Sequence, residues 1–185
     1  MIEITRISRA LIKRQEPKCI WFTGLSGAGK STIANLLEIR LHEMGRHTYL
    51  LDGDILRQGI NIDLGFTEAD RTENIRRVAQ VAKLMVDAGL IVLVATISPL
   101  EKDREFARSL FNQGEFLEVF VDTSIQECER RDAKGLYKMA RLGTLKLFTG
   151  ISSPYEIPTN PELHLPCDQL ATHQAVERLM LTIKL

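Results

Sequence analysis

The amino-acid sequence predicts an α/β fold in which helices cover both faces of a five-stranded parallel sheet, giving three layers. Short apolar runs alternate along the chain with longer segments in which apolar residues recur at helical spacing, and this alternation is typical of such a sheet. With 185 residues the chain can bury one core, and its composition marks neither a second domain nor a disordered tail. We therefore expect a single α/β domain.

The expected strands are short apolar runs bounded by polar segments. Continuous apolar runs of this length are typical of strands that are buried on both faces of a parallel sheet. They cover residues 19–23, 48–52, 90–97, 116–122 and, as the weakest, 163–165.

Two helices are predicted with clear ends. Residues 30–44 carry an apolar face, and Gly45 follows at a position where glycine commonly ends a helix. Residues 68–88 follow Thr67, and Asp70 stands three positions after that threonine, which is a variant of the capping box. These helices would connect the first strand to the second and the second to the third.

The segment 130–161 breaks the alternation of strands and helices. It is rich in Lys, Arg, Gly and Pro, and it has one short helical pattern at residues 136–142. Loops this long inside a compact domain are usually functional. We therefore expect a mobile lid over the functional site.

Residues 1–18 form a basic arm ahead of the domain, which spans residues 19–185. Ile4, Ile7 and Leu11 recur at helical spacing, but this stripe is too short and too poor in aromatic residues for a membrane anchor. We expect the arm to pack on the surface of the domain. Its basic residues are Arg6, Arg9, Lys13, Arg14 and Lys18.

The composition argues against several classes of protein. Lys plus Arg and Asp plus Glu each number 24, and a net charge of zero gives no case for general nucleic-acid binding. No stretch reaches the roughly 18 apolar residues of a membrane span, and the N-terminus lacks the apolar core of a signal peptide. Cys19, Cys128 and Cys167 are odd in number and far apart, which fits neither disulfides nor a zinc site and favours the reducing cytoplasm.

Residues 24–31, GLSGAGKS, match the phosphate-binding pattern G-x-x-x-x-G-K-[ST] between an expected strand and an expected helix. The glycines let successive backbone N–H groups point at phosphate oxygens, and the helix N-terminus adds about half a positive charge. Lys30 is expected to bridge the β- and γ-phosphates of ATP, and the Ser31 hydroxyl is expected to join the shell of Mg²⁺. The predicted ATP-binding residues of this loop are Gly24, Leu25, Ser26, Gly27, Ala28, Gly29, Lys30, Ser31 and Thr32.

Two carboxylates, Asp52 and Asp54, close the second expected strand. Many P-loop proteins orient Mg²⁺ through an acid at the end of another apolar strand, yet the run 90–97 is followed by Ser98 and contains no acid. We therefore assign Asp52, with Ser31, to the metal, and we assign Asp54 to accepting the proton of an attacking hydroxyl. The alternative is that Asp-Gly-Asp merely turns the chain.

Several longer motifs, in order and at matching spacing, resemble those of the adenylylsulfate kinase family. They are GLSGAGKST, LDGD followed by R-x-G, DLGF-x-x-x-DR-x-ENIRR, ISP, EVFVDT, CE-x-RD-x-KGLY and FTGI, and they cover nearly all of residues 19–165. The resemblance implies an adenylate-kinase-like P-loop fold and a homodimer. It also implies ATP-dependent phosphorylation of the ribose 3′-hydroxyl of adenosine 5′-phosphosulfate (APS) to 3′-phosphoadenosine 5′-phosphosulfate (PAPS) in sulfate assimilation, and it leaves open an association with ATP sulfurylase.

The same resemblance implies an acceptor site. Arg57, Arg71 and Lys134 supply cations for the phosphosulfate group. Phe66 and Phe148 offer faces on which an adenine can stack. The implied acceptor-binding residues are Asp52, Asp54, Arg57, Phe66, Arg71, Asn74, Ile97, Ser98, Lys134 and Phe148.

Lys30, Asp54 and Ser98 are the residues implied in catalysis. Family accounts have treated the serine as a phosphoserine intermediate, yet no His, Lys or Asp stands beside Ser98 in the sequence to activate this weak nucleophile. We expect direct in-line transfer, with Ser98 binding the acceptor. In the lid, Arg131 matches a family position that packs on the base of ATP.

The sequence departs from the family pattern at two positions that concern the acceptor. Ile55 stands where the family commonly has Asn, and Ser152 stands where it has Asp. These changes leave open a 3′-kinase for another nucleotide diphosphate analogue. A non-catalytic module that binds sulfonucleotides is a further alternative, although such a module would be expected to lose Lys30 and its loop.

Overall fold

The computed structural model describes residues 3–183, so residues 1–2 of the expected arm and 184–185 of the expected domain lie outside the described residues. One five-stranded sheet has the order β2-β3-β1-β4-β5, and every neighbouring pair of strands is parallel. The strands are β1 (Cys19–Thr23), β2 (Thr48–Asp52), β3 (Ile91–Ala95), β4 (Phe116–Asp122) and β5 (Leu163–Pro166). The prediction of a five-stranded parallel sheet in an α/β fold is confirmed.

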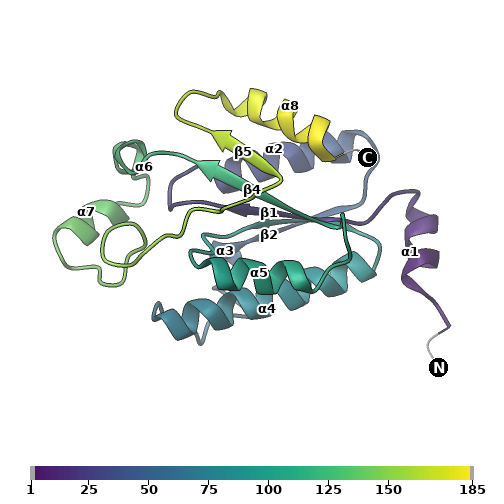
Figure 1. The fold of residues 1–185 in the computed structure, drawn as a ribbon, viewed down its shortest axis with the longest axis horizontal. Coiled ribbons are helices and arrows are strands. Elements are labelled where there is room, and N and C mark those ends of the chain that lie inside the picture. Colours follow the sequence, from purple (N-terminus) through teal and green to yellow (C-terminus); the bar gives the residue numbers. More distant parts are fainter. Residues whose placement is uncertain (1–2, 184–185) are drawn as a thin grey trace.

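Helices cover both faces of the sheet (Figure 1). On one face lie α2 (Lys30–Glu43) and α8 (Thr172–Ile183), and on the other lie α4 (Glu68–Asp87) and α5 (Glu101–Ser109). Each face has its own buried apolar cluster, and Trp21 of the central strand enters the cluster beneath α4. The three expected layers are therefore present.

The predicted helix ends follow from local hydrogen bonds. The Thr67 hydroxyl accepts the N–H of Asp70 at 3.2 Å, and the Asp70 carboxylate accepts the N–H of Thr67 at 3.1 Å, which confirms the capping box of α4. After α2, Gly45 has a φ of +71° in the left-handed region that favours glycine. The chain therefore reverses direction where the sequence predicted.

The third strand is shorter than its apolar run. Residues 90–97 were expected to pair, but β3 ends at Ala95. Beyond that point the Ile97 carbonyl accepts the Thr23 hydroxyl at 2.7 Å instead of a strand partner. At the other end, the Leu90 N–H bonds the Met85 carbonyl at 3.1 Å and so belongs to the turn that closes α4.

Several helices were not anticipated from the sequence. They are α3 (Gly53–Leu56), α5, α6 (Ile125–Arg131) and α8. The expected lid, residues 130–161, contains α7 (Leu136–Arg141), as its helical pattern predicted, and is otherwise largely irregular. Figure 1 places α7 at the opposite end of the molecule from α1 (Arg6–Lys13).

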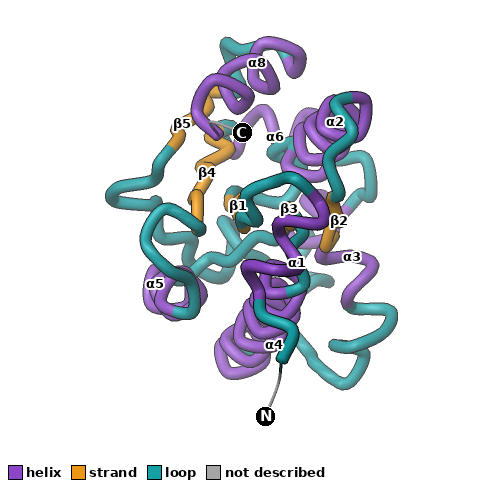
Figure 2. The backbone as a smooth tube through the Cα atoms, turned by 90° about the vertical axis from the view of Figure 1, so that its right-hand side faces the viewer, coloured by secondary structure: helices purple, strands orange, loops and turns teal. Residues whose placement is uncertain are grey.

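The N-terminal arm lies across the end of the sheet at which β2 and β3 begin (Figure 2). The Gln15 side-chain amide donates to the carbonyls of His47 and Gly89 at 2.9 and 2.8 Å, and these residues precede the two strands. Arg6 pairs with Glu115, whereas the apolar side chains of α1 are exposed. The arm therefore packs on the domain through its polar face, with its apolar stripe outward.

The cysteines and the apolar character of the helices were both considered in the sequence. All three cysteines are free thiols: Cys19 and Cys128 are buried, and Cys167 is half-buried. Within residues 3–183, no helix combines the length and the apolar character that a membrane span requires.

Candidate functional site

A cavity of about 600 Å³ opens at the carboxyl ends of β1, β2 and β3. In parallel α/β sheets this edge is where ligands bind. The phosphate loop, α3, the start of α4 and the lid supply its walls. Of the predicted site residues, those lining it are Ser26, Gly27, Gly29, Lys30, Ser31, Thr32, Asp52, Asp54, Arg57, Phe66, Arg71, Asn74, Ile97, Ser98, Arg131, Lys134 and Phe148. Gly24, Leu25 and Ala28 of the loop do not line it.

The phosphate loop has a backbone that requires glycine. Gly24 and Gly29 have φ values of +148° and +107°. A Cβ atom on Gly24 would lie 2.5 Å from the carbonyl oxygen of Val121, so no side chain fits there. The glycines thus let the loop pass close to β4 before α2 begins at Lys30.

Lys30 lies beneath this loop with its ammonium buried. Its Nζ donates to the carbonyls of Gly24 and Leu25 at 2.9 and 2.7 Å. Burial lowers the pKa of Lys30 to about 8, because water no longer solvates the charge. A phosphate anion in the loop would restore favourable charge interactions to this ammonium.

Ser31 and Asp52 connect the loop to the end of β2. The Ser31 hydroxyl donates to Asp52 Oδ2 at 2.5 Å, and Asp52 Oδ1 accepts the N–H of Asp54 at 2.9 Å, which caps α3. The sequence posed a turn and a functional pair as alternatives, and Asp52 serves the turn while it also lines the cavity. A hydroxyl and a carboxylate are the oxygen ligands that Mg²⁺ prefers. Residues 3–183 contain no cluster of three or more His, Cys, Asp or Glu suited to a metal.

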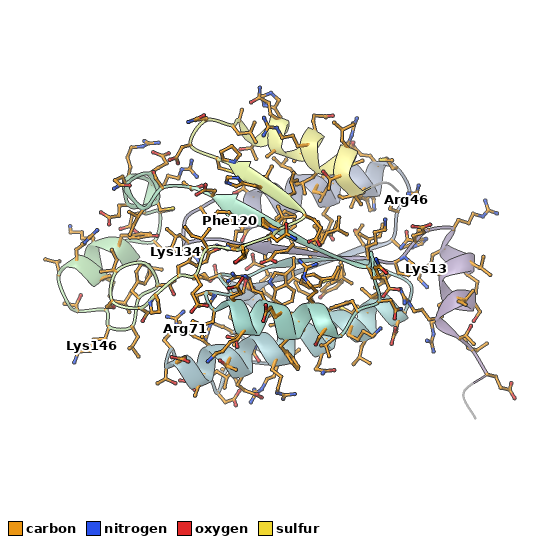
Figure 3. The ribbon with its side chains drawn as sticks, viewed as in Figure 1. Lys13, Arg46, Arg71, Phe120, Lys134 and Lys146 are labelled. Atoms are coloured by element: carbon orange, nitrogen blue, oxygen red, sulfur yellow. The ribbon has the colours of Figure 1, made fainter. Side chains whose placement is uncertain are left out.

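Lys134 in the lid forms an ion pair with Asp54 on α3. Figure 3 shows Lys134, Arg71 and Lys146 at the same end of the molecule, with Lys13 and Arg46 at the opposite end. The side chains of Lys134 and Asp54 are both largely exposed at the cavity. The residue predicted as base and a cation predicted for the acceptor are therefore in direct contact.

Two arginines surround Phe66 on the acceptor side of the cavity. The guanidinium carbon of Arg57 lies 4.5 Å from the centre of the Phe66 ring, and that of Arg71 lies 5.8 Å from it. Burial lowers the pKa of both arginines, which nevertheless stay protonated at neutral pH. Among the described residues neither forms a salt bridge, so two cations remain available to an anion.

Asn74 and Phe148 are fixed parts of the cavity wall. The buried Asn61 amide donates to Asn74 Oδ1 at 3.0 Å. Phe148 is only 8% exposed and packs edge-on against Tyr137, with ring centres 4.9 Å apart. Phe66, 51% exposed, is therefore the more accessible of the two aromatic rings that were predicted to stack on adenine.

Ser98 is held in an unusual conformation. Its φ of +40° lies in the left-handed region, and the residue is 1% exposed. Its hydroxyl accepts the indole N–H of Trp21 at 3.1 Å. No basic side chain of the described residues reaches this hydroxyl, which supports the prediction that Ser98 is not a nucleophile.

Arg131 lies against the phosphate loop. Its Nη1 is 3.4 Å from the Ala28 carbonyl, and its Nε donates to Glu127 at 2.8 Å. Hydrogen bonds from Arg130 and Arg131 lower the pKa of Glu127 to about 2. A charged carboxylate thus holds Arg131 beside the loop.

Two threonines of the cavity wall were missed by sequence reasoning. Thr96 and Thr149 both line the cavity, and the hydroxyl of each is buried without a hydrogen-bond partner in residues 3–183. Buried hydroxyls are rarely unpartnered, so these two mark polar positions of the site. Thr149 lies within FTGI, but an uncharged residue carries no signal that singles it out.

Similar sequences occur in proteins of different lengths. The sequence profile described as adenylylsulphate kinase matches residues 16–166. The bifunctional enzyme NodQ of Rhizobium tropici is 61% identical over 164 residues, which cover 89% of this chain and 26% of NodQ. The adenylyl-sulfate kinase of Marinobacter nauticus is 56% identical over 178 residues, which cover 96% of this chain and 89% of that protein. The chain therefore spans about a quarter of the bifunctional relative and most of the shorter one.

The fold also matches a solved structure with ligands. The APS kinase of Mycobacterium tuberculosis, solved in complex with AMPPNP and APS, is 48% identical and superimposes with a TM-score of 0.87. The match covers 92% of this chain and 99% of that chain.

Proposed function

Because this chain belongs to the adenylylsulphate kinase family, we propose that it transfers the γ-phosphate of ATP to the 3′-hydroxyl of APS, giving PAPS and ADP. The observation that carries this proposal is one cavity with two anion sites. The phosphate loop and Lys30 would form one, and the guanidiniums of Arg57 and Arg71, which have no salt-bridge partner in residues 3–183, would form the other.

ATP would bind on the phosphate loop. Backbone N–H groups and the N-terminus of α2 face the phosphates, and Lys30 would exchange its bonds to the Gly24 and Leu25 carbonyls for phosphate oxygens. Arg131, beside the loop, would then contact the base. Alignment of the two substrates can supply up to roughly 7–11 kcal/mol of the rate acceleration.

APS would occupy the other side of the cavity. Its phosphosulfate carries about two negative charges, which Arg57 and Arg71 can neutralise through charge-assisted hydrogen bonds. Phe66 offers an accessible ring for the adenine. This arrangement would point the ribose 3′-hydroxyl toward the loop.

Asp54 would accept the proton of the 3′-hydroxyl during in-line transfer. Its carboxylate is held near the loop because Asp52 caps the short helix on which Asp54 lies. Lys134 must first leave Asp54, and the anionic acceptor offers this lysine an alternative partner. The base would contribute about 10² to 10⁴ in rate.

Mg²⁺ would bind with ATP, held through Ser31 and Asp52. Their oxygen atoms fit the ligand preference of this ion, and the ion would neutralise charge on the transferred phosphoryl group. Ser31 and Asp52 hold each other in position and keep both oxygens at the edge of the phosphate loop.

The rival acceptors gain no support from the cavity wall. Ile55 and Ser152 motivated them, and neither residue lines the cavity. Ile55 is exposed on α3. Ser152 accepts the N–H of Phe148 at 2.9 Å and so keeps this wall residue in place. These two departures therefore do not argue against APS.

The test is ADP release from ATP and Mg²⁺ with micromolar APS, compared with AMP, ADP and cytidine diphosphate as acceptors. A strong preference for APS, with PAPS identified as product, is the expected result. The Lys30→Ala variant, which should lose turnover while remaining folded, controls for contaminating kinases. Turnover on another acceptor with none on APS would refute the proposal for this substrate, and ATP turnover with any acceptor would exclude a non-catalytic module.

We further propose that the chain acts in the cytoplasm as a homodimer and works beside ATP sulfurylase. The family resemblance supports the dimer, and three free thiols suit a reducing compartment. Light scattering and sedimentation, with and without ATP sulfurylase, would test both associations.

A further inference from the structure

Two residues other than glycine face the cavity in the left-handed backbone conformation. Ser98 has a φ of +40°, and Leu147 has a φ of +57°. This conformation is unfavourable for residues with a side chain, and it persists only where surrounding groups hold it. Each carbonyl accepts a hydrogen bond from a guanidinium. Arg71 donates to the Leu147 carbonyl, and Arg104 Nη1 donates to the Ser98 carbonyl at 2.9 Å.

Arg104 lies outside the cavity wall and is almost completely buried. It belongs to α5, is 2% exposed, and donates through Nε to Glu118 at 2.7 Å. Its Nη2 is buried and has no partner in residues 3–183. A buried guanidinium with an unmade hydrogen bond is costly, and an apolar residue often serves stability better. Stability alone therefore does not explain this arginine.

The acceptor turn, residues 97–98, is held from outside the cavity by three side chains. Trp21 donates to the Ser98 hydroxyl, and Thr23 donates to the Ile97 carbonyl at 2.7 Å and, at a longer 3.4 Å, to the Ser98 carbonyl. Both come from β1. Arg104 is the charged member of this set, and it alone reaches the turn from α5.

We propose that Arg104 is a positioning residue for the acceptor: its bond to the Ser98 carbonyl keeps the acceptor turn in the left-handed conformation that shapes the acceptor side of the cavity. The proposal rests on the proposed kinase function. Without this bond Ser98 relaxes toward negative φ, and Ile97 and Ser98 leave their places in the wall. The affinity for the acceptor then falls, whereas the affinity for ATP is kept because the phosphate loop retains its own hydrogen bonds.

The test compares Arg104→Lys with Arg108→Lys. Lysine at 104 keeps a positive charge beside Glu118 but lacks the planar fork that also reaches Ser98. Arg108 is the matched control, since it lies one turn later on α5, pairs with Glu118 and Glu162, and does not contact the turn. We expect Arg104→Lys to raise the KM for APS at least tenfold and to change the KM for ATP less than twofold. Equal losses in both KM values, or equal effects of the two variants, would overturn the proposal.

Trp21 gives a readout that needs no substrate. It is the single tryptophan of the chain, and its indole N–H bonds Ser98. Emission from Trp21 should therefore shift in folded Arg104→Lys and stay unchanged in Arg108→Lys. An unchanged emission spectrum in folded Arg104→Lys would contradict the proposal that Arg104 keeps Ser98 in its conformation. If the wild type does not use APS, the kinase proposal fails, and this spectrum still decides the role of Arg104.

Ser98→Gly provides a second check. Glycine adopts positive φ freely, so the turn no longer needs the arginine to hold its backbone. The KM effect of Arg104→Lys should therefore shrink at least threefold in the Ser98→Gly background. Full additivity of the two changes would show that Arg104 acts by another route.

Discussion

The Lys134 ammonium pairs with the Asp54 carboxylate and so joins the lid to α3 across the cavity. One partner is the proposed base, and the other is a proposed ligand of the acceptor. While the pair is intact, the carboxylate is bonded to the lysine and not to an acceptor hydroxyl. Binding of an anionic acceptor would separate the partners, so the base becomes available when a substrate is present.

Replacing Lys134 with Met tests this relationship. We expect the KM for APS to rise about tenfold or more, because a charged hydrogen bond is worth about 1.5–3 kcal/mol. Hydrolysis of ATP without acceptor should rise, since Asp54 can then accept a proton from water. Lys138→Met, which replaces an exposed lysine on the lid helix α7, is the control and should change neither the KM for APS nor the acceptor-free hydrolysis. A fall in acceptor-free hydrolysis would argue against the coupling.

Asp54→Asn tests the base itself. The amide cannot accept the proton, and turnover should fall at least about a hundredfold. ATP affinity, measured by calorimetry, should survive because Asp54 belongs to the acceptor side of the mechanism. Near-normal turnover would rule out this role.

Ser98→Ala should keep turnover within about tenfold of the wild type. The hydroxyl accepts a hydrogen bond from Trp21, and no base within residues 3–183 contacts it, so its loss should remove a hydrogen bond and no nucleophile. Mass spectrometry of the quenched wild-type reaction should find no phosphoserine at this position. Complete inactivity together with trapped phosphoserine would reverse this conclusion.

The pH dependence of ATP binding should reflect Lys30. Its pKa of about 8 in the free protein will rise when phosphate oxygens surround the ammonium, so binding above about pH 8 takes up a proton. Affinity should be level below this pH and should fall by up to about tenfold per unit above it. Calorimetry in two buffers of different ionisation enthalpy measures the proton directly. Lys30→Arg, which stays protonated, should abolish the dependence.

Thr67→Ala should destabilise the fold by about 1 kcal/mol, because α4 loses a side-chain cap. For a chain of this size the melting temperature should fall by roughly 2–4 °C. Thr182→Ala, which removes a hydroxyl bonded within α8, is the control and should stay within about 0.5 kcal/mol of the wild type. Equal shifts in the two variants would show that the cap adds little.

The sequence predicted strands better than helices, for a physical reason. Three strands began and ended where expected, since polar residues or glycines bound their apolar runs. The helix α5 was missed because its buried face carries Asp103 and Arg104, which give no apolar periodicity. The arm was expected to pack on the surface of the domain, but the contacts that Arg6 makes could not be predicted because its acidic partners, Asp87 and Glu115, lie far away in the sequence.

The candidate site was predictable as far as its motifs extend. The phosphate loop, Asp52 and Asp54 could be placed because chemistry requires these residue types beside a strand end. The ion pair of Lys134 with Asp54 and the hydrogen bond from Arg104 to the Ser98 carbonyl could not be predicted, because each depends on how separate elements pack together. The hydroxyls of Thr96 and Thr149, which have no hydrogen-bond partner in the part of the chain that the structure describes, can be recognised only when the hydrogen bonds are known.

The strand order has a consequence for the making of the protein. Of the five strands of this sheet, the central strand β1 leaves the ribosome first, and its neighbours β3 and β4 begin only at Ile91 and Phe116. At about 5–20 residues per second, several seconds pass before β1 can pair with any strand. Its apolar segment, which includes Trp21 and Phe22, must wait unpaired during that time. Newly made chains that stop short of β3 should therefore depend on chaperones more than completed ones do.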